Sequence, residues 1–211
     1  MRTDELIAAL AADVGRPRWR ARQALALAMV AGALGALSTF VVMLGPRPDL
    51  GAALATWRFD WKLVLFAVAA VLAFADCARL ADPSSRGLAG RASLAIPALL
   101  LAGVAVELAV TPAASWLPRL EGSNAAVCLA SIPLLAVIPL GAGLAAMRHG
   151  APASGAEAGA AAGRLAAAVA ALLYAVHCAD DSPLFVAVWY VLATIPVMLA
   201  GAVAGGRVLR W

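Results

Sequence analysis

Long apolar segments dominate the sequence and limit what it can fold into. Six of them reach the length of about 20 residues that an α-helix needs to cross a bilayer. The expected spans are 23–45, 62–80, 92–111, 124–147, 158–178 and 184–206. The chain is 64% hydrophobic and 13% charged, which is more apolar surface than a soluble domain can bury. The sequence therefore predicts an all-α, polytopic membrane bundle of six transmembrane helices, because a strand exposed to lipid would leave its backbone unpaired.

The distribution of basic residues predicts how these spans are oriented. If the N-terminus is cytoplasmic, the basic residues on the outer side are Arg47, Arg58, Lys62 and Arg119. All the others fall on the inner side, in keeping with the excess of lysine and arginine in cytoplasmic loops. We therefore expect both termini to be cytoplasmic. The formal net charge of +4 follows from this topology, so we expect contact with the lipid bilayer and no direct binding of nucleic acid.

One outer turn gathers polar residues between two apolar runs: "HCADDSPLFVAVWY", residues 177–190. The turn between the fifth and sixth spans is short, so these two helices should form an antiparallel hairpin. Ser182 or Asp181 can cap the last span, and Pro183 suits its first turn, where the missing N–H costs nothing. Capping by itself would account for these polar side chains.

Two of the three cysteines fall at matching depth near the outer surface. Cys178 ends the fifth span, and Cys128 lies near the outer start of the fourth, so both are within about 8 Å of that surface. They could form a disulfide or bind a soft metal. Further candidate ligands in the turn are His177, Asp180 and Asp181. The alternative is that both thiols are ordinary small apolar residues. Cys77, near the inner end of the second span, has no assigned role.

Glycines at four-residue spacing predict where helices approach closely. Gly155, Gly159 and Gly163 share one helix face, and Gly201 and Gly205 repeat the spacing in the last span. Such faces allow close contact between backbones, either within one chain or between chains. The alternative is that a composition rich in alanine and glycine produces the spacing by chance.

The first 21 residues are expected to form a cytoplasmic unit, separate from the transmembrane domain of residues 22–211. Thr3 can cap a short helix, and Asp4 and Glu5 follow in its first turn, where negative charge suits the helix dipole. Its apolar face consists of Leu6, Ile7, Leu10 and Val14. This face could lie on the membrane or dock into a groove of a cytoplasmic protein. The acidic residues favour docking, because anionic lipid would repel them.

Taken together, these features resemble the NrsF-type integral-membrane anti-sigma factors, negative regulators of an extracytoplasmic-function (ECF) sigma factor in proteobacteria. The resemblance covers essentially the whole chain. Its most specific parts are "MRTDELIAALAAD", "HCADDSPLFVAVWY" and "RVLRW". It implies a protein of the bacterial inner membrane whose cytoplasmic face holds an ECF sigma factor away from RNA polymerase. It also implies that Cys128 and Cys178 are needed for the response to metal or oxidative stress. Ala179 departs from the proline that family members often carry there.

The resemblance suggests a role for each polar element. The apolar face of the tail would occupy a groove on the sigma factor, and Asp4 and Glu5 would meet its basic residues. A change at Cys128 and Cys178 would then shift their helices and release the partner.

Other functional classes are less well supported by the sequence. A small transporter or channel would need charge within the membrane, and Glu107 is close enough to the outer interface to reach it. A membrane thiol or metal-binding redox protein would offer a close, reactive cysteine pair. The spans contain no catalytic constellation and no histidines at facing depths for haem. We therefore expect no enzyme activity and no cofactor.

Overall fold

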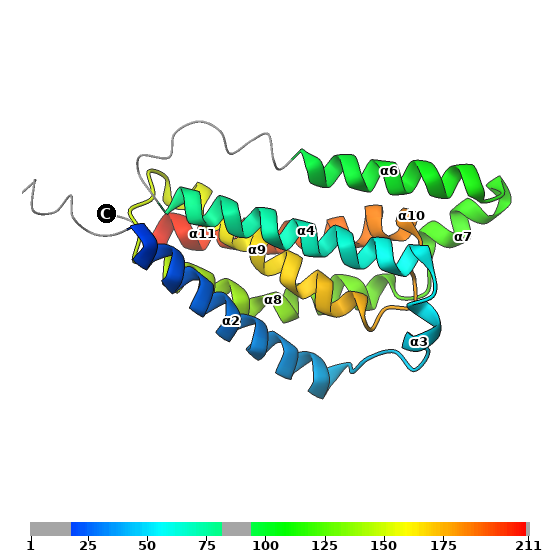
Figure 1. Cartoon of the computed structure of the whole chain (residues 1–211), viewed down its shortest axis with the longest axis horizontal. Helices are drawn as coiled ribbons and strands as arrows, with labels where there is room; N and C mark the ends of the chain where they lie inside the picture. Colours follow the sequence, from blue (N-terminus) through cyan, green and yellow to red (C-terminus); the bar gives the residue numbers. More distant parts are fainter. Residues whose placement is uncertain (1–17, 82–93, 210–211) are drawn as a thin grey trace, which may run out of the picture.

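The computed structural model describes residues 18–81 and 94–209, with side chains from residue 22 onward, and every regular element in these ranges is a helix (Figure 1). The long helices are α2 (Arg18–Met43), α4 (Trp57–Leu80), α6 (Ala95–Val110), α8 (Ala125–Met147), α9 (Gly155–Ala175) and α11 (Val191–Val208). The short ones are α3 (Leu50–Ala53), η1 (Ala113–Ser115), α7 (Trp116–Glu121), α10 (Pro183–Phe185) and the π-helix η2 (Val186–Tyr190). The all-α prediction is confirmed for these residues. The helix predicted in the first 21 residues lies outside them, apart from its basic lead at the start of α2.

Five helices in the described part of the chain are long and apolar enough to cross a membrane, so the prediction of six was wrong. The segment predicted at 92–111 forms α6, which has 16 residues. At about 1.5 Å per residue this helix is roughly 24 Å long, less than the ~30 Å of a hydrocarbon core. It ends where Thr111 adopts an extended backbone, with φ −119° and ψ 140°. The cause is Pro112, which disfavours a helical conformation in the residue before it.

Helix α9 occupies the centre of the bundle and packs against α4, α8 and α11 (Figure 1). Within its apolar stretch 72% of the residues are buried, against at most 39% in the other four helices that are long and apolar enough to cross a membrane. This is possible because most of the residues that α9 buries are alanine or glycine, which let neighbouring helices approach closely. α6 lies at the side of the bundle, where it contacts α4 and α10.

The predicted glycine faces meet each other across α9 and α11, within one chain. A Cβ atom added to Gly159 would lie 2.1 Å from the carbonyl oxygen of Gly201, and one added to Gly205 would lie 2.4 Å from that of Gly155. No side chain fits at such separations. The four-residue spacing is therefore a packing surface, and the two helices form the antiparallel hairpin that the short turn predicted.

The bundle has two distinct ends (Figure 1). α2 begins and α11 ends at the same one, here called the terminal end. The opposite end, here called the loop end, carries the connections between α2 and α4, between α6 and α8, and between α9 and α11. The thiol-bearing turn lies at the loop end, so any signal received there must pass along the helices to reach the terminal end.

Candidate functional site

The turn after α9 has the local structure that its sequence predicts. Ser182 caps the following helix, because its Oγ accepts a hydrogen bond from the Leu184 N–H at 3.3 Å. Pro183 occupies the first helical position, where no N–H is needed. The turn is thus anchored at its C-terminal side, and Cys178 is held just beyond the end of α9.

Cys128 and Cys178 belong to one buried cluster and are both fully inaccessible to solvent. They are free thiols in the structure, with no disulfide between them. Their helices α8 and α9 pack side by side, as the sequence predicted. Burial raises the pKa of the Cys178 thiol, and the positive charge of Lys62 opposes that shift. At neutral pH Cys178 is therefore protonated at rest.

The other candidate ligands in the turn make contacts away from the two thiols. The Nδ1 atom of His177 lies 2.9 Å from the carbonyl oxygen of Gly45. The Asp180 carboxylate accepts hydrogen bonds from the backbone N–H groups of Ser123 and Asn124, at 3.0 and 2.8 Å. Asp180 therefore stabilises the start of α8. Within residues 18–81 and 94–209, no three His, Cys, Asp or Glu residues form a group able to hold a metal ion.

Asp181 lies at the centre of a buried ion cluster with Lys62 and Arg47, here called the Lys62 cluster. Lys62 is fully buried; its Nζ binds the Asp181 carboxylate and donates a hydrogen bond to the Cys178 carbonyl oxygen at 3.0 Å. Arg47 donates to the other Asp181 oxygen at 2.7 Å. The cluster thus fastens the turn to α4 and to the loop after α2. This contact was not predicted from the sequence, in which Lys62 was assigned only to the outer side of the membrane.

Arg47 also pairs with Asp49 in the same loop, through contacts of 2.6 and 2.7 Å. This pair raises the pKa of the Arg47 guanidinium and lowers the pKa of the Asp49 carboxyl. Arg47 therefore stays charged and retains a counterion even without Asp181.

Glu107 forms a second buried ion cluster, on the α6 side of the loop end. Its carboxylate is inaccessible to solvent and binds Arg58 at 2.8 Å and Arg119 at 3.1 Å. The Ser182 hydroxyl donates to it at 3.3 Å. The sequence placed Glu107 near the outer end of its helix but did not indicate these partners, which are far apart along the chain.

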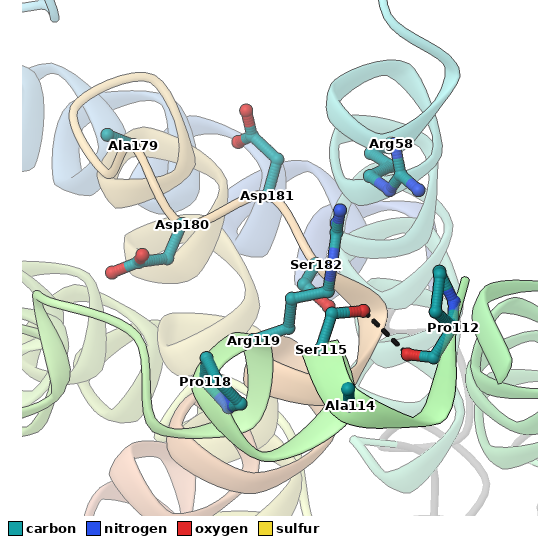
Figure 2. A pocket seen from close by; sticks show the side chains of 10 residues that line it. All are labelled: Arg58, Pro112, Ala114, Ser115, Pro118, Arg119, Ala179, Asp180, Asp181 and Ser182. Carbon is teal, nitrogen blue, oxygen red and sulfur yellow. Dashed lines mark hydrogen bonds between the residues drawn. The ribbon is translucent and has the colours of Figure 1, made fainter.

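A pocket of about 680 Å³ with several charged residues in its wall opens between these two clusters (Figure 2). Arg58 and Arg119 line one part of it, and Ala179, Asp180 and Asp181 line another. The residue that follows Cys178 is therefore part of the pocket wall. Small polar solutes can approach the thiol-bearing turn from this side.

Two tyrosines lie beside the thiols and were not singled out from the sequence. Tyr174 on α9 and Tyr190 on η2 are fully buried in the same cluster as Cys128 and Cys178, with ring centroids 5.6 Å apart. Neither hydroxyl makes a hydrogen bond to any residue that the structure describes. The π-helical turn of η2 positions Tyr190, and wide turns of this kind are frequent at functional sites.

The remaining predicted residues lie elsewhere. Cys77 is buried near the last turn of α4, in a separate cluster at the terminal end. The predicted partner-binding residues are outside the described residues: Asp4, Glu5, Leu6, Ile7, Leu10 and Val14.

Comparison with known proteins identifies the family. Residues 10–211 match the family model "NrsF: Negative regulator of sigma F". The chain is 34% identical to the anti-sigma-F factor NrsF of Caulobacter vibrioides, over the full length of both chains. It is 32% identical to the probable anti-sigma-F factor NrsF of Azospira oryzae, again over the full length of both. No solved structure matches the chain. The chain therefore belongs to the NrsF family, the negative regulators of sigma F.

Proposed function

We propose that this protein sits in the bacterial inner membrane, holds an ECF sigma factor at its cytoplasmic face and releases it when Cys128 and Cys178 change state. The observation that carries the proposal is the match to the NrsF family over residues 10–211. An anti-sigma factor acts by binding its sigma factor, so a protein partner is required and catalysis is not.

The outward-facing side chains of the five long helices support a position in lipid. Large apolar residues are widely exposed on them, including Leu27 at 72%, Val71 at 68% and Val42 at 85%. A soluble protein rarely exposes so much contiguous apolar surface, whereas a bilayer would cover it. Because α2 begins and α11 ends at the terminal end, we infer that this end faces the cytoplasm, in line with the bias of arginines toward that side.

The thiols are well placed to change how the helices pack. Cys128 is on α8, and Cys178 follows α9, the central helix that contacts α4, α8 and α11. Moving a partner from mostly bound to mostly free requires about 5.5 kcal/mol of differential affinity. A new disulfide, worth about 2–4 kcal/mol, together with lost packing, is of that order. A covalent change at the loop end can therefore alter the terminal end.

Copurification tests partner binding directly. We expect the full-length chain, expressed with its cognate ECF sigma factor and solubilised in detergent, to retain that sigma factor on an affinity column. Deletion of residues 1–15 should abolish retention, because it removes the apolar face and the acidic residues predicted to dock. Retention without the tail would place the contact in the inner loops instead. Absence of retention by the intact chain would refute the proposed partner.

We also predict that release of the sigma factor on stress requires Cys128 and Cys178. In a reporter strain, the double variant Cys128→Ser/Cys178→Ser should repress as well as the parent but fail to release the sigma factor on oxidative or metal stress. Serine preserves size in the buried cluster while removing the reactive sulfur. Cys77→Ser is the control and should respond normally, because Cys77 lies in the other cluster. A double variant that still responds would exclude these thiols as the sensor.

A further inference from the structure

The Tyr174 and Tyr190 hydroxyls are buried without a hydrogen-bond partner. Such a group costs about 1–3 kcal/mol relative to a paired one, so native proteins seldom contain it without a reason. Two of them occur here in adjacent rings, beside the two thiols. Phenylalanine would fill the same space without this cost. The hydroxyls therefore point to a state of the protein in which they do have a partner.

Cys178 has a more polar environment than Cys128. Its sulfur lies 3.9 Å from the carbonyl oxygen of Asp180, and its own carbonyl oxygen accepts the hydrogen bond from Lys62. Cys128 lies within α8 among apolar side chains, and its sulfur makes no hydrogen bond to any described residue. The two thiols are therefore not equivalent.

We propose that the Tyr174 and Tyr190 hydroxyls form a binding site for the oxygen atom that oxidation adds to Cys178, so that Cys178 reacts first and Cys128 resolves the product. This inference rests on the proposed sensing function and assigns a distinct role to each thiol. The tyrosines act as positioning residues. Their hydroxyls donate hydrogen bonds to the added oxygen atom and to the negative charge that develops while this oxygen is transferred.

The chemistry requires a two-electron oxidant, for which a hydroperoxide is the simplest class. The Cys178 thiol loses its proton, and the sulfur attacks the distal oxygen; the O–O bond breaks and an S–O bond forms. The products are a sulfenic acid on Cys178 and an alcohol, or water when the oxidant is hydrogen peroxide. The Cys128 thiol then attacks the Cys178 sulfur. A disulfide forms and one water molecule leaves with the sulfenic oxygen and the displaced protons.

The pocket at the loop end offers the oxidant an approach to the turn that carries Cys178 (Figure 2). Its wall includes Ala179 and Asp180, which directly follow the thiol in the chain. Neither thiol lines the pocket itself, but Cys178 directly precedes Ala179 in the pocket wall, whereas neither Cys128 nor its chain neighbours take part in the lining. Access therefore favours the same order of reaction as the polar environment does.

The order of reaction can be tested on full-length protein in detergent, without any sigma factor. Single cysteine variants are treated with hydrogen peroxide in the presence of dimedone, which traps sulfenic acids, and the labelled residue is identified by mass spectrometry. Cys128→Ser should accumulate the dimedone adduct on Cys178, because nothing resolves it. Cys178→Ser should give no adduct on Cys128. An adduct confined to Cys128, or formed equally on both residues, would overturn the assignment while leaving partner binding intact.

Removal of the hydroxyls tests the tyrosines themselves. In the Cys128→Ser background, Tyr190→Phe and Tyr174→Phe should each slow adduct formation on Cys178 by about tenfold, since a hydrogen bond to a charged group contributes enough for such a factor. Thr194→Val is the control, because it removes an exposed α11 hydroxyl that is hydrogen-bonded to the Val191 carbonyl oxygen. In this variant Cys178 should form the adduct at the rate of the Cys128→Ser parent. The thermal unfolding midpoint (Tm) of each variant shows whether a slower reaction is caused by a loss of folded protein. Unchanged rates in both phenylalanine variants would overturn the role of the tyrosines.

Discussion

Gly159→Ala is expected to lower the stability of the bundle more than any other glycine-to-alanine substitution in α9. The new Cβ would lie 2.1 Å from the Gly201 carbonyl oxygen and 2.7 Å from the Gly205 Cα. Both neighbours are backbone atoms, so the two helices must separate to relieve the contact. Overpacking of this kind costs about 1–3 kcal/mol where side chains can shift, and more where they cannot. SDS titration followed by circular dichroism would measure the loss of unfolding free energy.

Gly141→Ala provides the matched control for this prediction. Gly141 is an exposed glycine within α8, and nothing lies within 4 Å of an added Cβ. Because alanine has the higher helix propensity, by about 1 kcal/mol, this substitution should be neutral or slightly stabilising. Equal effects at the two positions would show that α9 and α11 are not in contact.

Lys62→Met is expected to destabilise the protein by about 3–5 kcal/mol, the usual cost of leaving one partner of a buried ion pair without the other. Methionine keeps most of the volume of the lysine stem but cannot bind Asp181 or the Cys178 carbonyl oxygen. The carboxylate would retain only Arg47, and the turn would lose its connection to α4. The same SDS titration measures the effect.

The double variant Lys62→Met/Asp181→Asn tests whether the loss arises from the unpaired carboxylate. Neutralising Asp181 removes that charge, and Arg47 keeps Asp49 as its counterion. The double variant should therefore be more stable than the sum of the two single losses implies, with a coupling energy of about 0.5–3 kcal/mol. Strictly additive losses would mean that Lys62 and Asp181 act independently.

The long apolar helices were predictable because a membrane span requires a long uninterrupted run of apolar residues. The 124–147 prediction matches α8 within one residue at its start. The exception, α6, shows the limit of hydropathy: its composition fits a span, but the helix begins at Ala95 and ends at Val110, which is shorter than the predicted 92–111. The glycine faces were predictable as surfaces. The four-residue spacing of the glycines does not determine whether two such faces meet within one chain or between two chains, because that depends on how the helices pack.

The candidate site was only partly predictable. Local features of the turn, such as capping by Ser182 and the position of Pro183, follow from neighbouring residues and were recovered. The ion clusters were not, because Lys62 and Asp181 are far apart in sequence and meet only after α4 packs against α9. The two tyrosines occur within apolar runs and look like ordinary core residues. Their significance depends on hydroxyls without partners, which only a structure reveals.

The π-helix η2 makes the length of the last long apolar helix as important as its composition. A π-helix accommodates one residue more than an α-helix in the same length, and each α-helical residue advances the chain by roughly 100°. Removing one residue between 186 and 190 would therefore turn Gly201 and Gly205 away from α9, or else turn Tyr190 away from Cys178. The extra residue keeps the tyrosine and the glycine face in phase. A shift of η2 into α-helical geometry would rotate one of these groups relative to the other, so this turn can couple chemistry at the thiol to movement at the far end of the helix.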